Sequence, residues 1–580
     1  MNEAITHALM NYLLLALPEL VLGVFACVMF LGATWRGGRN LWGGGALVGL
    51  GLAAAALIFT AFAVPTIQAM QARLAEIPRQ LDEIKTEKTI TAEKAEKETA
   101  DLQAESQELT ATIDAQRYAG PLVNTGLTLF LKALALAGAV VLVLTGWNEV
   151  SDDLAAEFHA CLLLITAGVC LTGAANDLVT LFLSLELISI PTYILLYLPR
   201  SDAKAQESAM KYFLLSIFSS ALLLFGFSYL YGAAGTTNLT AVGEAVMKPG
   251  QDAGSAGLTW TAVVLATAGL GFRITAVPFH FYAPDVYEGT TPSAAAILSF
   301  VPKVAGFAVL LRIFGYNFGL PGDSHLILGR LLEGQGLKLL WILSAVTMTL
   351  GNVLALLQNN LRRLLAYSSV AHAGYILAGL TAGATLLPGQ EMRQDGVAAV
   401  VFYLVAYGAM TIGAFAVLSY LTGHRSRVET VDDLAGLSVS RPGAALLMVL
   451  FLFSLIGIPL TAGFWAKWQI IYSVLSLPPG ADSFWFILLA VVTAINAAIG
   501  GWYYLRIAAV MYLRTPLHPM DRPRSTPALA AVWLCALVTL AVGLYPRPLQ
   551  QWVQSALTTG APATAAPGQT AITDAAPAAR

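Results

Sequence analysis

The sequence predicts an all-α protein that crosses a lipid bilayer about fourteen times. Of its 580 residues, 57% are apolar and 12% are charged, whereas soluble domains carry about twice that charged fraction. The mean hydropathy is +0.69, and apolar stretches of spanning length recur along the whole chain. A chain of this composition is expected to have lipid as its main solvent.

The apolar stretches are interpreted as fourteen spanning helices. The N-terminus lacks the basic region of a cleaved signal peptide, so the first stretch is interpreted as a retained helix. The predicted spans are 10–32, 41–64, 122–146, 157–175, 177–199, 209–232, 258–285, 291–318, 337–357, 362–386, 396–421, 443–475, 485–512 and 527–546.

Lysine and arginine are unevenly divided between the short loops of the two sides. With the N-terminus outside, the inside loops hold Arg36, Arg39, Arg200, Lys204, Arg362, Arg363, Arg425, Arg427, Arg441, Arg514, Arg522 and Arg524. The outside loops then hold Lys248, Arg330, Lys338, Arg393 and Arg547. Because basic loops favour the inside, this asymmetry predicts that both termini lie outside.

Residues 65–120 interrupt the apolar pattern with a polar insert rich in Glu, Lys, Ala and Thr. Four apolar residues in it are spaced as in a heptad seam, namely Leu74, Ile77, Leu81 and Ile84. Pro78 is expected to kink an early turn. The insert is interpreted either as a bent helix or helical hairpin outside the membrane, or as a solvated charged helix without a partner.

Four ionisable residues fall at membrane depth. They are Glu186 in LFLSLELISIP, Arg273 in GLGFRITAVPFH, Lys303 in SFVPKVAGF and Lys467 in GFWAKWQII. Each costs roughly 2.5–3.5 kcal/mol on insertion scales, so such residues are functional candidates by default. Buried carboxylates and lysines titrate away from their usual pKa values and can pass protons along a row. The alternative, a side chain that reaches the membrane surface, is as plausible for Lys132 and Lys211.

Two of these spans also contain helix breakers. Pro278 follows Arg273 in the seventh span, and Gly457, Pro459 and Gly463 precede Lys467 in the twelfth. Interrupted membrane helices in corresponding positions of two repeats indicate an ion path. The five-helix spacing predicts that helices 4–8 and 9–13 are inverted copies. A proline kink without function is the alternative.

The predicted organisation therefore has seven parts. They are two spans (1–64), the insert (65–120), the third span and a loop (121–156), the first repeat (157–320), the second repeat (335–515), the last span (516–548) and a tail (549–580). The tail is rich in Ala, Pro and Thr, which predicts disorder.

Other residues extend or limit the possible chemistry. His280 and His372 are candidates for the relay because imidazole titrates near neutrality, and a hydrogen-bonded core histidine is the equal alternative.

The four cysteines form no CxxC pair, and the chain has no phosphate-binding loop and no haem motif. We therefore expect no cofactor or metal in this chain, and a net charge of −3 gives no basic surface for nucleic acid.

Five long segments resemble a known family. They are LFLSLELISIPTYILLY, KYFLLSIFSSALLLFGFSYLYG, GFRITAVPFHFYAPDVYEG, GNVLALLQNNLRRLLAYSSVAHAGYILAGL and FSLIGIPLTAGFWAKW. These segments are similar to the antiporter-like membrane subunits of proton-pumping NADH-quinone oxidoreductase (respiratory complex I), and most of all to the subunit N family. The resemblance runs from about residue 122 to 512, and the insert is not expected in that family.

The resemblance implies a proton-translocating subunit that is driven by quinone reduction in partner subunits of a bacterial inner-membrane complex. Flavin, iron–sulfur clusters and quinone are then expected in those partners. Glu186, Lys303 and Lys467 match the family's residues of the fifth, eighth and twelfth helices, and Lys211 matches a lysine at the start of the sixth. Arg273 replaces the family's seventh-helix lysine, and arginine cannot release a proton.

Several alternatives remain open at this stage. The same core occurs in Mrp-type sodium/proton antiporter complexes. A lysine at position 467 favours subunit N over subunit M, which typically has glutamate there, and the chain ends too early for the lateral helix of subunit L. With Arg273, the chain could also be a scaffold that only supports its neighbours. A quinone-binding redox subunit is disfavoured because no cofactor ligands are found.

Overall fold

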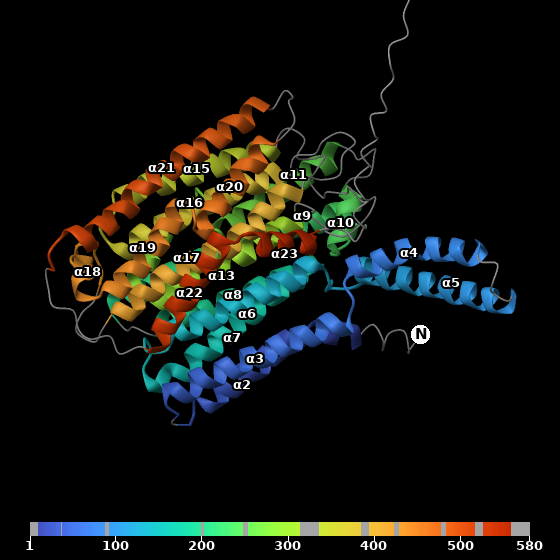
Figure 1. The fold of residues 1–580 in the computed structure, drawn as a ribbon, viewed down its shortest axis with the longest axis horizontal. Helices are drawn as coiled ribbons and strands as arrows, with labels where there is room; N and C mark the ends of the chain where they lie inside the picture. The colour runs from blue at the N-terminus through green and yellow to red at the C-terminus, as the bar shows by residue number, and fades with distance from the viewer. Residues whose placement is uncertain are drawn as a thin grey trace, which may run out of the picture.

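The computed structural model confirms the predicted fold class. It describes residues 10–35, 37–86, 92–198, 202–246, 253–313, 336–383, 394–422, 428–476, 483–516 and 526–557. Within these ranges the regular structure is helical, and β-pairing is limited to isolated bridges. Most helices pack nearly parallel in one bundle (Figure 1). The basic loop residues used for the orientation fall partly outside the described ranges, so the orientation stays a prediction.

The N-terminal part comprises α2 (Leu17–Gly32), α3 (Arg39–Ala63), α4 (Ile67–Thr86), α5 (Ala92–Asp114) and α6 (Gly126–Gly146). The first repeat comprises α7 (Ala155–Ala174), α8 (Leu178–Tyr197), α9 (Ala203–Ala234), α10 (Leu239–Val246), α11 (Ala253–Arg273), α12 (Ala283–Gly289) and α13 (Pro292–Ile313). The second repeat comprises α15 (Leu337–Leu356), α16 (Leu361–Gly383), α17 (Gln394–Leu421), α18 (Leu437–Ser440), α19 (Pro442–Ile456), α20 (Ala462–Leu475) and α21 (Ser483–Leu513). The chain continues with α22 (Thr526–Leu544) and α23 (Arg547–Leu557).

Every predicted span has a helical counterpart. Among the described residues, 11 helices are long and apolar enough to cross a membrane, and α2 and α19 are shorter apolar helices. The seventh and twelfth spans are each divided, into α11 and α12 and into α19 and α20. Each divided pair packs against the long third helix of its own repeat, α9 or α17. Because a five-helix unit crosses the membrane an odd number of times, the second copy is inverted.

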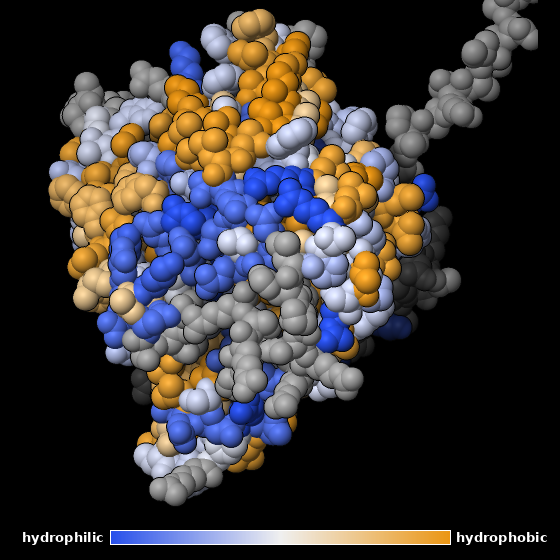
Figure 2. Space-filling view, turned by 90° about the vertical axis from the view of Figure 1, so that its left-hand side faces the viewer, coloured by the Kyte–Doolittle hydropathy of each residue, from blue (hydrophilic) through white to orange (hydrophobic). Residues whose placement is uncertain are grey.

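The surface agrees with a membrane-embedded bundle. Large apolar side chains are exposed along the outer faces of α8, α9 and α21, among them Leu183, Ile190, Phe218 and Trp502. Figure 2 shows the end of the bundle opposite α4 and α5, where hydrophilic residues cover the middle and hydrophobic residues flank them. This arrangement is typical of an aqueous face surrounded by lipid-facing sides.

The polar insert forms a helical hairpin of α4 and α5, which projects beyond the bundle (Figure 1). Its base is apolar: Ile67, Met70, Ile113 and Val123 pack together. Further out, Arg73 donates two hydrogen bonds to the Glu105 carboxylate, at 2.7 and 2.9 Å. This pairing lowers the pKa of Glu105. Of the predicted heptad seam, Leu74 packs against the apolar base and Ile77 is buried. Because α4 and α5 contact each other, the insert is a hairpin rather than a single helix without a partner.

The predicted disorder from residue 549 is wrong for its first part, because residues 547–557 form α23. Val553 and Leu557 of this helix are buried, and the Trp552 ring lies 4.6 Å from that of Phe130 on α6. Composition suggested disorder, but the apolar residues recur at helical spacing and bury one face. Residues 558–580 of the predicted tail lie outside the described residues.

The crossing of α15 and α16 in the second repeat depends on glycine. A Cβ at Gly374 of α16 would overlap the backbone and side chain of Met348 on α15. We expect Gly374→Val to lower the free energy of unfolding by about 1–3 kcal/mol, because overpacking forces the two helices apart. Thermal denaturation of the purified protein in detergent measures the loss. Gly232→Val on α9, where a Cβ has no atom within 4 Å, is the matched control and should leave the transition unchanged.

Candidate functional site

The Glu186 carboxylate of α8 lies in a hydrogen-bonded cluster with Arg273. The Arg273 Nη2 atom donates to Glu186 Oε1 at 3.0 Å, and the Ser220 hydroxyl of α9 donates to the same oxygen at 2.5 Å. Arg273 Nη1 donates to the Ser189 hydroxyl at 2.7 Å and to the Leu185 carbonyl at 3.1 Å. The guanidinium is 4% exposed and the carboxylate 23%. The arginine is thus fixed by bonds that a lysine cannot all make.

The position of Arg273 follows from the broken helix. It is the last residue of α11, where a cation is favoured by the helix dipole. The next residue, Ile274, packs closely against Gly306 of α13. Only glycine leaves room for it, because a Cβ at position 306 would lie 2.5 Å from the Ile274 side chain. The break therefore lets α11 end against α13, the helix that carries Lys303.

Lys303 is fully buried and lies among hydroxyl and carbonyl groups. Its Nζ atom contacts the carbonyl and hydroxyl oxygens of Ser369 on α16. The Tyr407 hydroxyl of α17 is 3.3 Å away, and the Tyr407 ring centroid is 5.0 Å away. No carboxylate forms an ion pair with Lys303 among the described residues. Neutral oxygen partners leave this amine able to exist with or without its extra proton.

His372 of α16 lies between tyrosines. Its Nδ1 atom is 2.6 Å from the Tyr403 hydroxyl, and its Nε2 atom is 3.3 Å from the Tyr504 hydroxyl. The imidazole centroid is 5.3 Å from the ring of Tyr407 and 5.5 Å from that of Tyr375. Because Tyr407 also contacts Lys303, this tyrosine joins the lysine to the histidine.

Lys467 of α20 lies at the other end of this row of buried side chains. Its amine binds carbonyl groups that are left free where the second helix is broken. Its Nζ atom donates to the carbonyl oxygens of Leu455 and Ile456, at 2.8 and 2.9 Å. Both carbonyls belong to the last turn of α19, where the helix has no following amides to bind them. The same amine lies 4.9 Å from the centroid of Tyr375, which is also adjacent to His372.

A continuous line of buried groups thus runs through the middle of the chain. Its members are Lys303, Tyr407, His372, Tyr375 and Lys467, each in contact with the next. The Glu186–Arg273 pair precedes it, and among the described residues no hydrogen bond joins Arg273 to Lys303. The sequence predicted the charged members and His372. No role was predicted for Tyr407, Tyr403 or Tyr504, because a hydroxyl group in a spanning segment is the only feature that distinguishes them in the sequence.

Two residues that were predicted to belong to the relay, Lys211 and His280, lie outside the line of buried groups. Lys211 is 38% exposed and forms ion pairs with Asp285 and Glu207, both at 2.7 Å. Arg363 also binds Asp285, at 2.6 Å, so Lys211 belongs to a surface ion-pair cluster. His280 is half-buried in the irregular segment before α12. No hydrogen bond within the described residues links it to His372.

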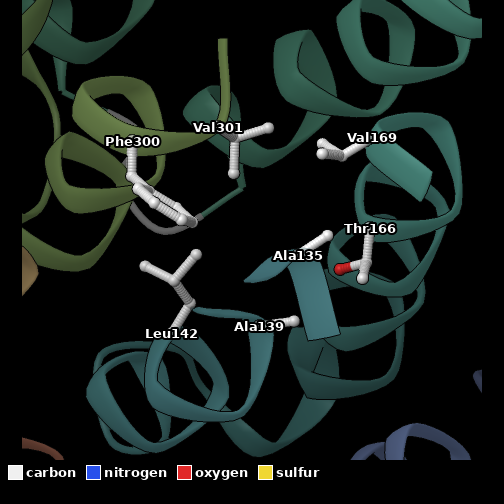
Figure 3. Close-up of a pocket in the computed structure, with 7 residues that line it drawn as sticks. All are labelled: Ala135, Ala139, Leu142, Thr166, Val169, Phe300 and Val301. Carbon is white, nitrogen blue, oxygen red and sulfur yellow. The ribbon is translucent and has the colours of Figure 1, made fainter. Parts of the chain in front are cut away.

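The described residues contain no group of His, Cys, Asp or Glu side chains that could hold a metal ion. A small cavity lies between α6, α7 and α13 (Figure 3), and no member of the line is among its lining residues. Six of its lining residues are apolar, and Thr166 is polar. The one polar side chain in this lining, Thr166, already donates its hydroxyl to the Leu162 carbonyl.

The comparisons with known proteins agree with this geometry. Residues 175–496 match the family model described as NADH:quinone oxidoreductase/Mrp antiporter, TM. A curated relative from Solibacter usitatus, "NADH-quinone oxidoreductase subunit N 1", is 38% identical over 447 residues, which cover 76% of this chain and 86% of the relative. Subunit N from Anaeromyxobacter sp. is 37% identical over 77% of this chain and 86% of the relative.

Solved structures show the same fold. A chain of respiratory complex I from Thermus thermophilus superposes with a TM-score of 0.66 at 26% identity, over 92% of this chain and 98% of that one. A chain of the Mrp complex from Dietzia sp. gives a TM-score of 0.70 at 18% identity, over 94% and 97%. The latter likeness shows the fold alone.

The chain is thus an antiporter-like, multi-pass membrane protein, and it belongs to the NADH:quinone oxidoreductase/Mrp antiporter family. Within this family, the two curated relatives described above are N subunits of NADH-quinone oxidoreductase.

Proposed function

We propose that this chain moves protons across a bacterial inner membrane as a subunit of NADH-quinone oxidoreductase, in which partner subunits reduce quinone. The observation that carries the proposal is the buried line from Lys303 through His372 to Lys467. Ionisable groups in a membrane interior are costly and are retained at ion paths. Flavin, iron–sulfur clusters and quinone belong to the partner subunits, and both termini lie on the outer side.

In the proposed mechanism, Arg273 is a fixed charge and the two lysines exchange protons. Arg273 stabilises the Glu186 carboxylate and keeps its own proton. Lys303 releases its proton toward His372 through the hydroxyl groups of Ser369 and Tyr407, and Lys467 accepts it through the groups around Tyr375. Each step changes the charge that its neighbour experiences, which links the steps in order.

Purification of the tagged chain tests this assignment. We expect flavin and iron–sulfur subunits to co-purify, and vesicles containing the complex to take up protons when NADH is oxidised. Co-purification with membrane subunits alone, together with sodium flux that needs no NADH, would instead identify an Mrp-type antiporter. The second candidate is supported by the shared fold and by the family model, which covers both kinds of protein. The relatives with 37–38% identity are N subunits, which favours the first candidate.

A further inference from the structure

The N-terminal helices hold a buried ion pair that the proposed relay does not use. Lys132 Nζ of α6 lies 2.8 Å from Glu19 Oε1 of α2, and the two side chains are 2% and 9% exposed. The same amine donates to the Leu15 carbonyl at 2.6 Å. A buried ion pair is roughly as stable as an apolar pair of the same size, so stability alone does not account for its presence.

This pair is connected to α13 through the next turn of α6. Thr128 lies four residues before Lys132, and its hydroxyl accepts a hydrogen bond from Arg312 Nη2 of α13 at 3.1 Å. Arg312 also donates to the Gly173 carbonyl of α7 at 2.7 Å and is buried. The helix that carries Lys303 is therefore bonded, on another face, to the turn beside the ion pair.

The base of the hairpin adds further polar groups at this end of α6. Gln68 of α4 accepts a hydrogen bond from the Gly126 amide at 3.1 Å, and Gln116 accepts one from the Asn124 amide at 3.4 Å. The Thr125 and Thr128 hydroxyls are 2.9 Å apart. Polar side chains thus extend from the hairpin base to Arg312, and Thr128 among them lies about one helical turn from Lys132.

Toward the middle of the bundle, the same face of α6 becomes apolar. Ala135 and Ala139, on the stripe that begins with Lys132, line the small cavity shown in Figure 3. Phe300 of α13 also lines it, and a Cβ at Gly138 or Gly408 would overlap the Phe300 ring. A tightly packed apolar layer holds no water and blocks protons. Among the described residues, the hydrogen-bonded polar groups near the pair therefore lie toward the hairpin base.

We propose that Glu19 and Lys132 form a second proton-binding site, which exchanges protons with the hairpin side of the membrane through the polar residues at the hairpin base. A hydronium ion at the hairpin base transfers a proton to a Glu19 oxygen. One O–H bond of the hydronium ion breaks, a new O–H bond forms on the carboxyl group, and a water molecule remains. Lys132 keeps its charge and its bond to Leu15, and release reverses the step. Arg312 transmits the change in charge to α13. The inference rests on the proposed function, since the exchanged species is the proton.

The test replaces the pair with apolar residues of similar size, in the intact complex. In the Glu19→Leu/Lys132→Met double variant and in Glu19→Gln, we expect normal amounts of assembled complex and a lower proton-to-electron ratio in vesicles. In infrared spectra taken during acid titration, a protonated-carboxyl band of the wild type should be missing from Glu19→Gln. The matched control is Arg39→Met/Asp152→Asn, which removes an exposed ion pair of 2.6 Å and should pump normally.

Wild-type pumping in both Glu19 variants, or no infrared difference, would overturn the inference and leave the pair as a structural contact. If the double variant fails to assemble, Glu19→Gln alone decides, because it keeps the shape of the side chain. Normal pumping in these variants together with loss of pumping in Lys303→Met would refute this site but keep the proposed function. Normal pumping in both Lys303→Met and Glu186→Ala would refute the proposed function itself.

Discussion

Replacement of Lys303 by methionine is expected to stop proton transfer through this subunit while the helices remain folded. Methionine fills the fully buried position with similar volume and no charge. The Ser369 and Tyr407 oxygens then have no amine from which to receive a proton. A positioned proton donor typically contributes 10²–10⁴-fold to a transfer step, so we expect the flux through this path to fall by about a hundredfold or more.

Proton uptake and NADH oxidation are measured together in vesicles that contain the complex. Quinone reduction should slow as well, because the two processes are coupled in the proposed mechanism. Lys204→Met is the matched control, since this lysine lies at the surface and is 66% exposed. Glu186→Ala should also reduce pumping, and unchanged pumping in both Lys303→Met and Glu186→Ala would count decisively against the relay.

The sequence contained enough to predict the architecture. Spanning helices follow from uninterrupted apolar runs, since each backbone polar group in lipid must be bonded within its own helix. The two breaks followed from Pro278 and from the Gly457–Gly463 segment, and the structure divides both helices there. In the second break, Gly457 adopts a φ of 93°, a conformation that favours glycine.

The site was predictable only in its charged members and His372. Glu186 and Lys303 were identifiable because a charge in an apolar run is costly, but Tyr407 and Tyr403 carry no such cost and resemble ordinary core residues. Their role depends on α16 and α17 crossing next to α13, which is a tertiary arrangement. The surroundings of Lys211 depend on tertiary structure in the same way: its sequence environment is apolar on one side, yet the fold places it beside Asp285.

The α23 helix and the Glu19–Lys132 pair show a further limit of sequence analysis. Glu19 stands near the start of a helix, where an acidic residue is ordinary, so its partner on α6 was not evident. Residues 547–557 are too few and too polar to be predicted as a stable helix alone. The burial of Val553 and Leu557 against the bundle supplies the missing stabilisation.

Replacement of Arg273 by alanine is expected to have the second-largest effect, on stability as well as on pumping. The variant loses four hydrogen bonds and leaves Glu186 without its cation. Removal of one partner from a buried pair costs about 3–5 kcal/mol, and the partial exposure of Glu186 favours the lower end. We expect a lower denaturation temperature of the complex and a reduced proton-to-electron ratio.

The conservative variant Arg273→Lys separates a fixed charge from a proton carrier. A lysine can still pair with Glu186, but its single amine cannot also reach both Ser189 and the Leu185 carbonyl as the guanidinium does. We therefore expect a milder loss of stability, with each missing hydrogen bond worth about 1 kcal/mol. If the arginine acts as a fixed charge, pumping persists in Arg273→Lys and falls in Arg273→Ala. If the native chain is only a scaffold, the wild type does not contribute to the proton-to-electron ratio, and Arg273→Lys raises that ratio above the wild-type value.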